Sequence, residues 1–301
     1  MSRSVSPPNG PAWSPIHEPE EAMSGVRWLH VARLAPVLGV LSITLLYPLG
    51  LMIIAAFRGA QGWSLAPATR IIASPVFAGA LGHTLQIALT STVLCLLLGF
   101  VLALLLNLAP FRGAASVGRV VDAYLSFPSF LIALALTFLY GNAGLITALL
   151  EPLQGSPYRS ASFLYGFWGV VLAEVTFYTP FVLRPVLAGF QSLDPALLEM
   201  ASSLGETPAG VIRRVVIPAL LPALLAGGGL CLLLTLNEFG IMLVMGAKNV
   251  ITLPLLIYGE AVQQFNYAGA SVIAVCDSVI SLAVFALYRL ALTRLGAWLA
   301  A

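Results

Sequence analysis

Apolar residues run through this chain in long blocks that are separated by short polar segments. Six of the blocks have the length of about 20 mostly apolar residues that a helix needs to cross a bilayer. A helix satisfies its own backbone hydrogen bonds in lipid, which an open strand could not do. The pattern therefore predicts an all-α membrane protein, a bundle of six transmembrane helices. The predicted spans are Leu34–Phe57, Thr84–Leu106, Val120–Tyr140, Phe163–Phe190, Leu220–Met245 and Ala270–Leu292.

Basic residues outside the spans predict the orientation of the bundle, because cytoplasmic segments carry an excess of Lys and Arg. With the N-terminus inside, nine basic residues fall in cytoplasmic segments and four in outer loops. We therefore predict that both termini are cytoplasmic. Arg184, near the inner end of the fourth span, agrees with this orientation. The nine are Arg3, Arg27, Arg33, Arg112, Arg119, Arg213, Arg214, Arg289 and Arg294, and the four are Arg58, Arg70, Arg159 and Lys248.

The segment before the first span has a different composition. Its first 25 residues are rich in Ser, Pro and Glu, a composition that buries too little apolar surface to fold. We expect residues 1–33 to be a disordered cytoplasmic tail and residues 34–301 to be the transmembrane domain. The first apolar run starts too late and is too long for a cleaved signal peptide, so it is predicted to stay as an anchor.

Composition places the chain in lipid and argues against several functions. Of 301 residues, 59% are hydrophobic and 9% charged, and the mean hydropathy is +0.97, whereas soluble domains carry about 25% charged residues. The net charge of +2 is too small to indicate nucleic-acid binding. The three histidines are too scattered for a metal site, and the three cysteines lie in apolar runs without CxxC spacing, which favours packing roles. No metal or cofactor is predicted.

Residues 191–218, between the fourth and fifth spans, form a strongly patterned loop. Asp194 before Pro195 is typical of a helix start, because the Asp side chain caps free amides and Pro fits the first helical position. An apolar stripe then repeats at three- and four-residue spacing and consists of Leu197, Leu198, Ala201 and Leu204.

The same loop contains signals for a turn and a second helix. Gly205 is expected to end the first helix in the left-handed conformation. Thr207 and Pro208 then begin a second short helix, which runs through two adjacent arginines to Pro218. The loop is therefore predicted to be a helix–turn–helix.

Two interpretations of this loop are open from its residues. It could lie on the membrane surface with its arginines toward lipid headgroups, or it could dock a soluble partner. Docking is favoured by a patch of small residues that a groove can approach closely, beside Glu199, which is available for a charge-assisted contact. The patch is predicted to be exposed and to consist of Ala201, Ser202, Ser203 and Gly205.

The loop reads E-M-A-x3-G-x9-V-V-I-P from residue 199. It resembles the EAA loop, E-A-A-x3-G-x9-I-x-L-P, of permease subunits of binding-protein-dependent (type I) ABC importers. Glu199, Ala201, Gly205 and Pro218 match that motif, while Met200 replaces its first Ala. In that family the loop is a coupling helix that docks on the ATP-hydrolysing subunit. The resemblance implies this role for Glu199, Met200, Ala201, Ser202, Ser203, Leu204, Gly205, Glu206 and Pro218.

The sequence lacks the phosphate-binding motif of an ATP-hydrolysing protein. It has no GxxxxGK[ST] phosphate loop, and its only lysine, Lys248, lies in a predicted outer loop. It is therefore predicted to be a translocation subunit and not an enzyme. The resemblance implies ABC ATPase subunits, a second permease subunit of the same or a related chain, and an extracytoplasmic solute-binding protein as partners. It also implies a place in the bacterial inner membrane.

The stretch from Asn237 to Val275 is similar to the matching region of permeases for sulfate, iron(III), polyamines and phosphonates. The run EFG…GAK…TLPLLIYG, followed by ALYRL at the end of the sixth span, most resembles 2-aminoethylphosphonate permeases. The resemblance therefore implies import of 2-aminoethylphosphonate, with sulfate, iron(III) or a polyamine as alternatives.

Polar residues inside the predicted spans are candidates for the route of the solute. Glu174 falls within the fourth span, and Glu238 and Asp277 in the outer thirds of the fifth and sixth. A charge at the bilayer centre costs about 2.5–3.5 kcal/mol on insertion scales, so these side chains should face the interior. There they either line a pathway or pair and tie helices together. The candidate pathway residues are Glu174, Asn237, Glu238 and Asp277.

Two further features suggest helix contacts. Asp122 and Arg184 are both expected near the inner surface and could pair. Gly227–Gly229 is interpreted as a close helix-packing site.

Other classes of membrane protein explain the sequence less well. A secondary transporter or channel is expected to show internal repeats with broken spans, which the sequence lacks, and it leaves the patterned loop unexplained. A membrane enzyme would be expected to carry HExxH or GxSxG, which are absent.

Overall fold

The computed structural model describes residues 34, 36–59, 62–108, 111–154 and 163–299. The predicted tail, residues 1–33, lies outside the described residues. The chain divides into two compact units, residues 1–51 and 52–301. In the described residues, six helical segments are long and apolar enough to cross a membrane, as predicted. They are Pro36–Ala56, Pro75–Leu108, Ser129–Leu149, Phe167–Gln191, Pro208–Leu236 and Tyr267–Leu292.

The first candidate span is followed by a short hairpin and a short helix. The span includes a π-helical turn, η1 (Ser42–Leu46), followed by α2 (Tyr47–Ala56). A short antiparallel hairpin comes next, with Arg58 opposite Trp63. Its strands and the helix after it are β1 (Arg58–Gly59), β2 (Gly62–Trp63) and α3 (Ala66–Ile72).

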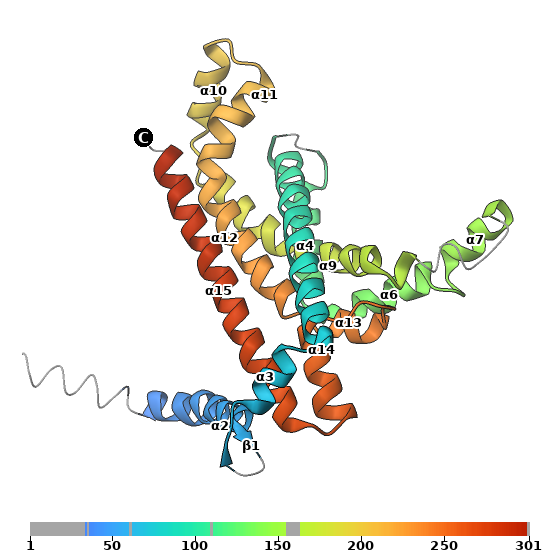
Figure 1. The fold of residues 1–301 in the computed structure, drawn as a ribbon. Helices are drawn as coiled ribbons and strands as arrows, with labels where there is room; N and C mark the ends of the chain where they lie inside the picture. The colour runs from blue at the N-terminus through green and yellow to red at the C-terminus, as the bar shows by residue number, and fades with distance from the viewer. Residues whose placement is uncertain (1–33, 35, 60–61, 109–110, 155–162, 300–301) are drawn as a thin grey trace, which may run out of the picture. The chain divides into compact units, whose positions relative to one another are not determined.

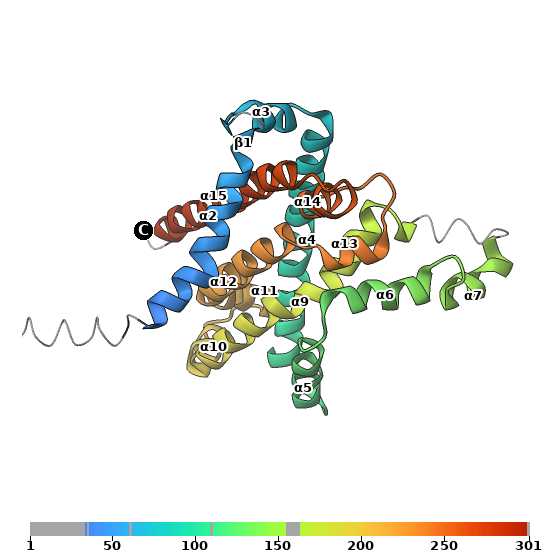
Figure 2. The same cartoon turned by 90° about the horizontal axis from the view of Figure 1, so that it is seen from below.

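Three long helices form the core of the second unit and pack against one another (Figures 1 and 2). They are α4 (Pro75–Leu108), α9 (Phe167–Gln191) and α12 (Ile217–Leu236). Their contact is close because glycines face Val182 of α9. A Cβ added at Gly99 of α4 or at Gly227 of α12 would lie 3.0 Å from a carbon atom of Val182. Small residues allow this approach in membrane helices.

The predicted packing role of Gly227–Gly229 is confirmed. A Cβ at Gly228 would lie 2.6 Å from the Tyr288 hydroxyl oxygen, and one at Gly229 would lie 2.9 Å from a Tyr288 ring carbon. Tyr288 belongs to α15 (Tyr267–Leu299), which runs beside α12 (Figure 1). The glycines thus let α12 contact α9 on one side and α15 on another.

Shorter helices complete the second unit. In both views α6 and α7 extend to one side of the core helices (Figures 1 and 2). At the amino end of α15 lie α14 and η3. The bounds are α5 (Ala114–Tyr124), α6 (Ser129–Tyr140), α7 (Leu145–Gln154), α13 (Gly240–Met245), α14 (Leu253–Tyr258) and η3 (Gly259–Gln263).

The second predicted span began at Thr84, whereas α4 begins at Pro75, and two other predicted spans run across a break between helices. The third was predicted to begin at Val120, but Val120 lies in α5, and the span begins at Ser129. Pro128 separates the two, because it lacks an amide donor and disfavours helical backbone at the residue before it. The fifth was predicted to continue to Met245, but α12 ends at Leu236 and a separate short helix, α13, follows.

Proline also shapes α9, which contains Pro180 in its interior. Pro180 has no N–H, so the carbonyl of Thr176, four residues earlier, loses its helical donor. The Tyr124 hydroxyl of α5 donates to that carbonyl at 3.0 Å. Burial raises the pKa of Tyr124 to about 12, so this hydroxyl keeps its proton at neutral pH. The contact joins α5 to α9 at the turn of helix that Pro180 interrupts.

Candidate functional site

Residues 191–218 form a helical hairpin at the end of the second unit where α12 begins and α15 finishes (Figure 1). The hairpin consists of α10 (Pro195–Ser203), α11 (Pro208–Val211) and η2 (Ile212–Val216), which continues into α12. Asp194 Oδ1 accepts from Ala196 N at 2.9 Å, and Thr207 Oγ1 accepts from Gly210 N at 3.1 Å. Both predicted helix starts are confirmed.

The turn between the two helices has the geometry that its glycine predicts. Gly205 has a φ of +82°, in the left-handed region. Gly205 N donates to Ser202 O at 3.0 Å, and Glu206 N to Ala201 O at 3.2 Å, which together make a Schellman motif. The Glu206 carboxylate pairs with Arg214 of η2. The hairpin is thus closed both by its backbone and by an ion pair.

Three residues of the predicted small-residue patch, Ser202, Ser203 and Gly205, are exposed as predicted, and the prediction is wrong for Ala201. Ala201 is buried. Leu198, one turn earlier on the same side of α10, packs on the main core. Met200 and Leu204 are instead 60% and 83% exposed. The predicted stripe is therefore split: Leu198 and Ala201 turn inward, and Leu197 and Leu204 turn outward.

A shallow hollow of about 360 Å³ marks the outer face of α10. It is lined by Ala196, Glu199, Met200, Ser203 and Leu204. Glu199 is exposed and forms no hydrogen bond or ion pair with any described residue. An unpaired carboxylate beside exposed apolar side chains is typical of a surface that another protein covers.

Glu238 lies at the break between α12 and α13, where its side chain joins three segments. Glu238 Oε1 accepts from Ser129 Oγ of α6 at 3.1 Å and from the Ile241 amide of α13 at 2.7 Å. Glu238 Oε2 accepts from the Tyr178 hydroxyl of α9. Glu238 therefore caps α13 and holds it against α6 and α9.

Glu174 lies about two turns into α9 and is the most enclosed of the acids. It is 1% exposed, and its Oε2 atom has no hydrogen-bond partner in the described residues. Its polar neighbours are Ser91 and Cys95 of α4 and Glu238. The structure therefore places Glu174 inside the packing of the core helices.

Asp277 lies on α15 one helical turn before Ser281, the residue that contacts Asn237 at the end of α12. Asp277 is 7% exposed, and its Oδ1 atom has no hydrogen-bond partner among the described residues. One turn later on α15, the Ser281 hydroxyl accepts from Asn237 Nδ2 at 3.4 Å. Asn237 is exposed. Of the four predicted pathway residues, Glu174 and Glu238 thus lie in one group, and Asn237 and Asp277 in another.

Sequence reasoning did not identify three residues of these groups, namely Tyr178, Ser129 and Ser281. Tyr178 follows Glu174 by one helical turn, and Ser281 follows Asp277 by the same spacing, so the i to i+4 rule could have found both. Ser129 carried no signal, because it lies 109 residues from Glu238 in the chain.

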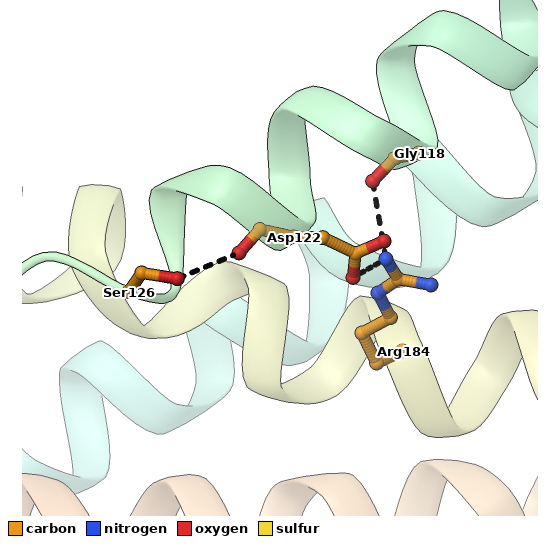
Figure 3. Close-up of polar contacts among 4 residues, drawn as sticks. All are labelled: Gly118, Asp122, Ser126 and Arg184. Carbon is orange, nitrogen blue, oxygen red and sulfur yellow. Dashed lines mark hydrogen bonds and ion pairs between the residues drawn. The ribbon is translucent and has the colours of Figure 1, made fainter.

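The predicted pairing of Asp122 with Arg184 is confirmed (Figure 3). Arg184 of α9 also donates through Nη2 to the carbonyl of Gly118 at 3.1 Å, so it contacts α5 at two points. The two side chains are 37% and 60% exposed, and exposed pairs contribute about 0–1 kcal/mol. The pair therefore mainly orients α5 along α9.

Comparison with known proteins agrees with this architecture. Residues 95–296 match the family described as binding-protein-dependent transport system inner membrane component. The chain is 46% identical to "Putative 2-aminoethylphosphonate transport system permease protein PhnU" of Salmonella typhimurium, over 94% of this chain and 97% of that protein. It is 30% identical to "Probable sulfate transport system permease protein cysT" of Prototheca wickerhamii, over 72% of this chain and 84% of that protein.

A solved structure has the same fold. It is a bacterial alginate ABC transporter in complex with an alginate pentasaccharide-bound periplasmic protein. The TM-score is 0.75 at 21% identity, over 89% of this chain and 95% of that chain. The resemblance inferred from the loop motif is confirmed by the family match. With its six apolar helices, this multi-pass protein of the bacterial inner membrane belongs to the family of binding-protein-dependent transport system inner membrane components, the permease subunits of ABC importers.

Proposed function

We propose that this chain is the translocation subunit of an importer for 2-aminoethylphosphonate. The observation that carries this proposal is the 46% identity to the 2-aminoethylphosphonate permease over 94% of the chain. The sulfate permease is 30% identical over a smaller share, so sulfate is the alternative that the same experiment tests.

In this proposal, residues 191–218 couple transport to ATP hydrolysis on a separate ATPase subunit. The exposed Met200 and Leu204, the unpaired Glu199 and the hollow between them support a docking surface. The caps at Asp194 and Thr207 support a rigid element. The helix α10 follows α9 after a short turn, and η2 continues directly into α12. A displacement of the hairpin would therefore move two core helices. The proposed docking set is Glu199, Met200, Ser202, Ser203, Leu204, Gly205, Glu206 and Pro218. Ala201, the remaining residue of the motif, is buried and supports the helix that carries them.

The remaining partners follow from the family. A second permease subunit completes the pore, and an extracytoplasmic binding protein delivers the solute. ATP binding must favour one of two conformations through its contacts at the hairpin, because a ligand shifts an equilibrium only by its differential affinity for the two states.

Uptake by vesicles that contain the complete transporter tests the substrate. With ATP inside and loaded binding protein outside, we expect accumulation of labelled 2-aminoethylphosphonate that excess unlabelled sulfate does not reduce. Uptake of sulfate in place of 2-aminoethylphosphonate would reject the proposed substrate. Accumulation by vesicles that contain this chain alone, without ATP, would reject the importer itself.

The Glu199→Lys variant tests the coupling role separately. Reversing this exposed charge should leave membrane insertion intact and reduce stimulation of ATP hydrolysis by the loaded binding protein about tenfold or more, since a charge-assisted contact contributes about 1.5–3 kcal/mol. Arg213→Glu, an equally exposed charge reversal outside the hollow, is the matched control. Unchanged stimulation in Glu199→Lys would remove the hairpin from the docking surface.

A further inference from the structure

The three buried acids of the described residues, Glu174, Glu238 and Asp277, differ in what they leave free for a ligand. Both carboxylate oxygens of Glu238 already accept hydrogen bonds. Glu174 is enclosed among the core helices. Asp277 is buried with an unpartnered oxygen, Oδ1, and an exposed polar residue adjoins its helix. A buried polar atom without a partner calls for an explanation. Among the described residues, Glu174 and Asp277 both have such an atom, and Asp277 is the one that lies a helical turn from a residue, Ser281, in contact with the exposed Asn237.

The side chains around Asp277 form a group of acceptors. Asn237 Nδ2 donates to Leu233 O at 2.9 Å and to Ser281 Oγ at 3.4 Å, so Asn237 Oδ1 remains free to accept. Ser281 Oγ keeps a second lone pair. Asp277 and Ser281 share a face of α15, since residues i and i+4 are neighbours. Within the described residues, Asp277 has no ion pair with Lys, Arg or His.

The exposure of Asn237 indicates what adjoins this group. A primary amide that faces lipid tails would leave polar atoms unsatisfied, which is costly. Asn237 is nevertheless exposed at the end of an otherwise apolar helix. Its face of the helix therefore adjoins a polar space, which in a permease is the route of the solute.

We propose that Asp277, Ser281 and Asn237 form a subsite for a primary ammonium group, and that it receives the amine of 2-aminoethylphosphonate during translocation. This proposal rests on the proposed function. An ammonium group has three N–H donors, and the group supplies three acceptors: one carboxylate oxygen, one hydroxyl and one amide carbonyl. The carboxylate also compensates the charge of the amine. Sulfate has no donor for this site, so the subsite selects for an amino-phosphonate.

Chemical modification of the wild-type protein tests the subsite directly. The complete transporter in lipid nanodiscs is treated with an excess of a hydrophobic carbodiimide. Mass spectrometry measures the loss of unmodified Asp277 and Glu174, whether the activated carboxyl rearranges to the N-acylurea or forms an amide with the added amine. We expect 2-aminoethylphosphonate and ethylammonium to slow the modification of Asp277 severalfold. Ethylphosphonate, which lacks the amine, should not slow it. Glu174 should react equally in every case.

Transport by variants provides the second readout. Asp277→Asn removes the charge and should lower the initial rate of 2-aminoethylphosphonate uptake about tenfold or more, because hydrogen bonds to charged groups are strong. Asp277→Glu should restore part of the rate. Ser278→Ala, which changes an exposed hydroxyl bonded to Ala274 O on the same helix, is the matched control and should transport as the wild type does.

The outcomes separate this subsite from the proposed function. If the wild type takes up 2-aminoethylphosphonate, but Asp277→Asn transports it equally well or ethylphosphonate protects Asp277 as strongly as ethylammonium, only the subsite is rejected. If the wild type does not take up 2-aminoethylphosphonate, the proposed function is rejected and the subsite with it. The subsite is supported if 2-aminoethylphosphonate and ethylammonium protect Asp277, ethylphosphonate does not, and Asp277→Asn transports slowly. Poor folding of a variant does not affect the protection result, because protection is measured on the wild type.

Discussion

The Tyr178 hydroxyl donates a hydrogen bond to the Glu238 carboxylate in the interior of the bundle. Tyr178→Phe leaves Glu238 Oε2 buried without that donor, which costs about 1–3 kcal/mol. We expect a lower apparent Tm for the purified variant in detergent.

Tyr288→Phe is the control for this variant. The Tyr288 hydroxyl donates to the Leu225 carbonyl at 3.0 Å, and that carbonyl also lies in the helical ladder of α12, so it keeps a partner. The Tm of Tyr288→Phe should fall less. Because Tyr178 and Glu238 share one contact, the effects of Tyr178→Phe and Glu238→Gln should not add. Additive losses would argue against the network.

Among the helices, α9 receives at its internal proline a hydrogen bond from a hydroxyl of another helix. Tyr124 of α5 satisfies the Thr176 carbonyl that Pro180 leaves free. The contact is exposed, so Tyr124→Phe should destabilise the protein by about 0.5–1.5 kcal/mol. In a Pro180→Ala background the restored amide can donate to Thr176 O, so the same substitution should cost less. An equal loss of Tm in both backgrounds would show that the proline is irrelevant to the contact.

The turn between α10 and α11 depends on the left-handed backbone of Gly205. Nothing lies within 4 Å of a Cβ added at Gly205, and its φ is +82°, so the cost of substitution comes from the backbone alone. Asn tolerates the left-handed region and Val does not. Gly205→Val should reduce the ATP hydrolysis that loaded binding protein stimulates, whereas Gly205→Asn should stay near the wild-type rate. Similar losses in both variants would contradict a backbone origin.

At the scale of the whole molecule, the orientation in the membrane is a prediction from the basic residues. The α10–α11 hairpin and the amino end of α15 lie at opposite ends of the second unit (Figure 1). In a background that lacks the three native cysteines, Ser203→Cys should react with an impermeant thiol reagent only from the cytoplasmic side. Gln264→Cys, before α15, should react only from outside. The reverse pattern would overturn the predicted orientation.

The sequence was sufficient for the features that depend on neighbouring residues. Span length is a local property, and so are the caps at Asp194 and Thr207 and the left-handed turn at Gly205. The loop motif, whose spacing is also local, identified the permease family before the tertiary contacts were known. The Asp122–Arg184 pair could be predicted because both residues lie near predicted span ends, where few partners compete.

The tertiary structure decided which buried polar groups are satisfied and which are free. The four candidate pathway residues looked equivalent in the sequence, because each is a polar residue in an apolar run. They separate only when Ser129 and Tyr178, which are 109 and 60 residues from Glu238, donate to its carboxylate, while Asp277 Oδ1 receives no donor from the described part of the chain. Hydrogen bonds between helices depend on how the helices pack, and a periodic pattern specifies which face is apolar but not which residue of another helix lies opposite.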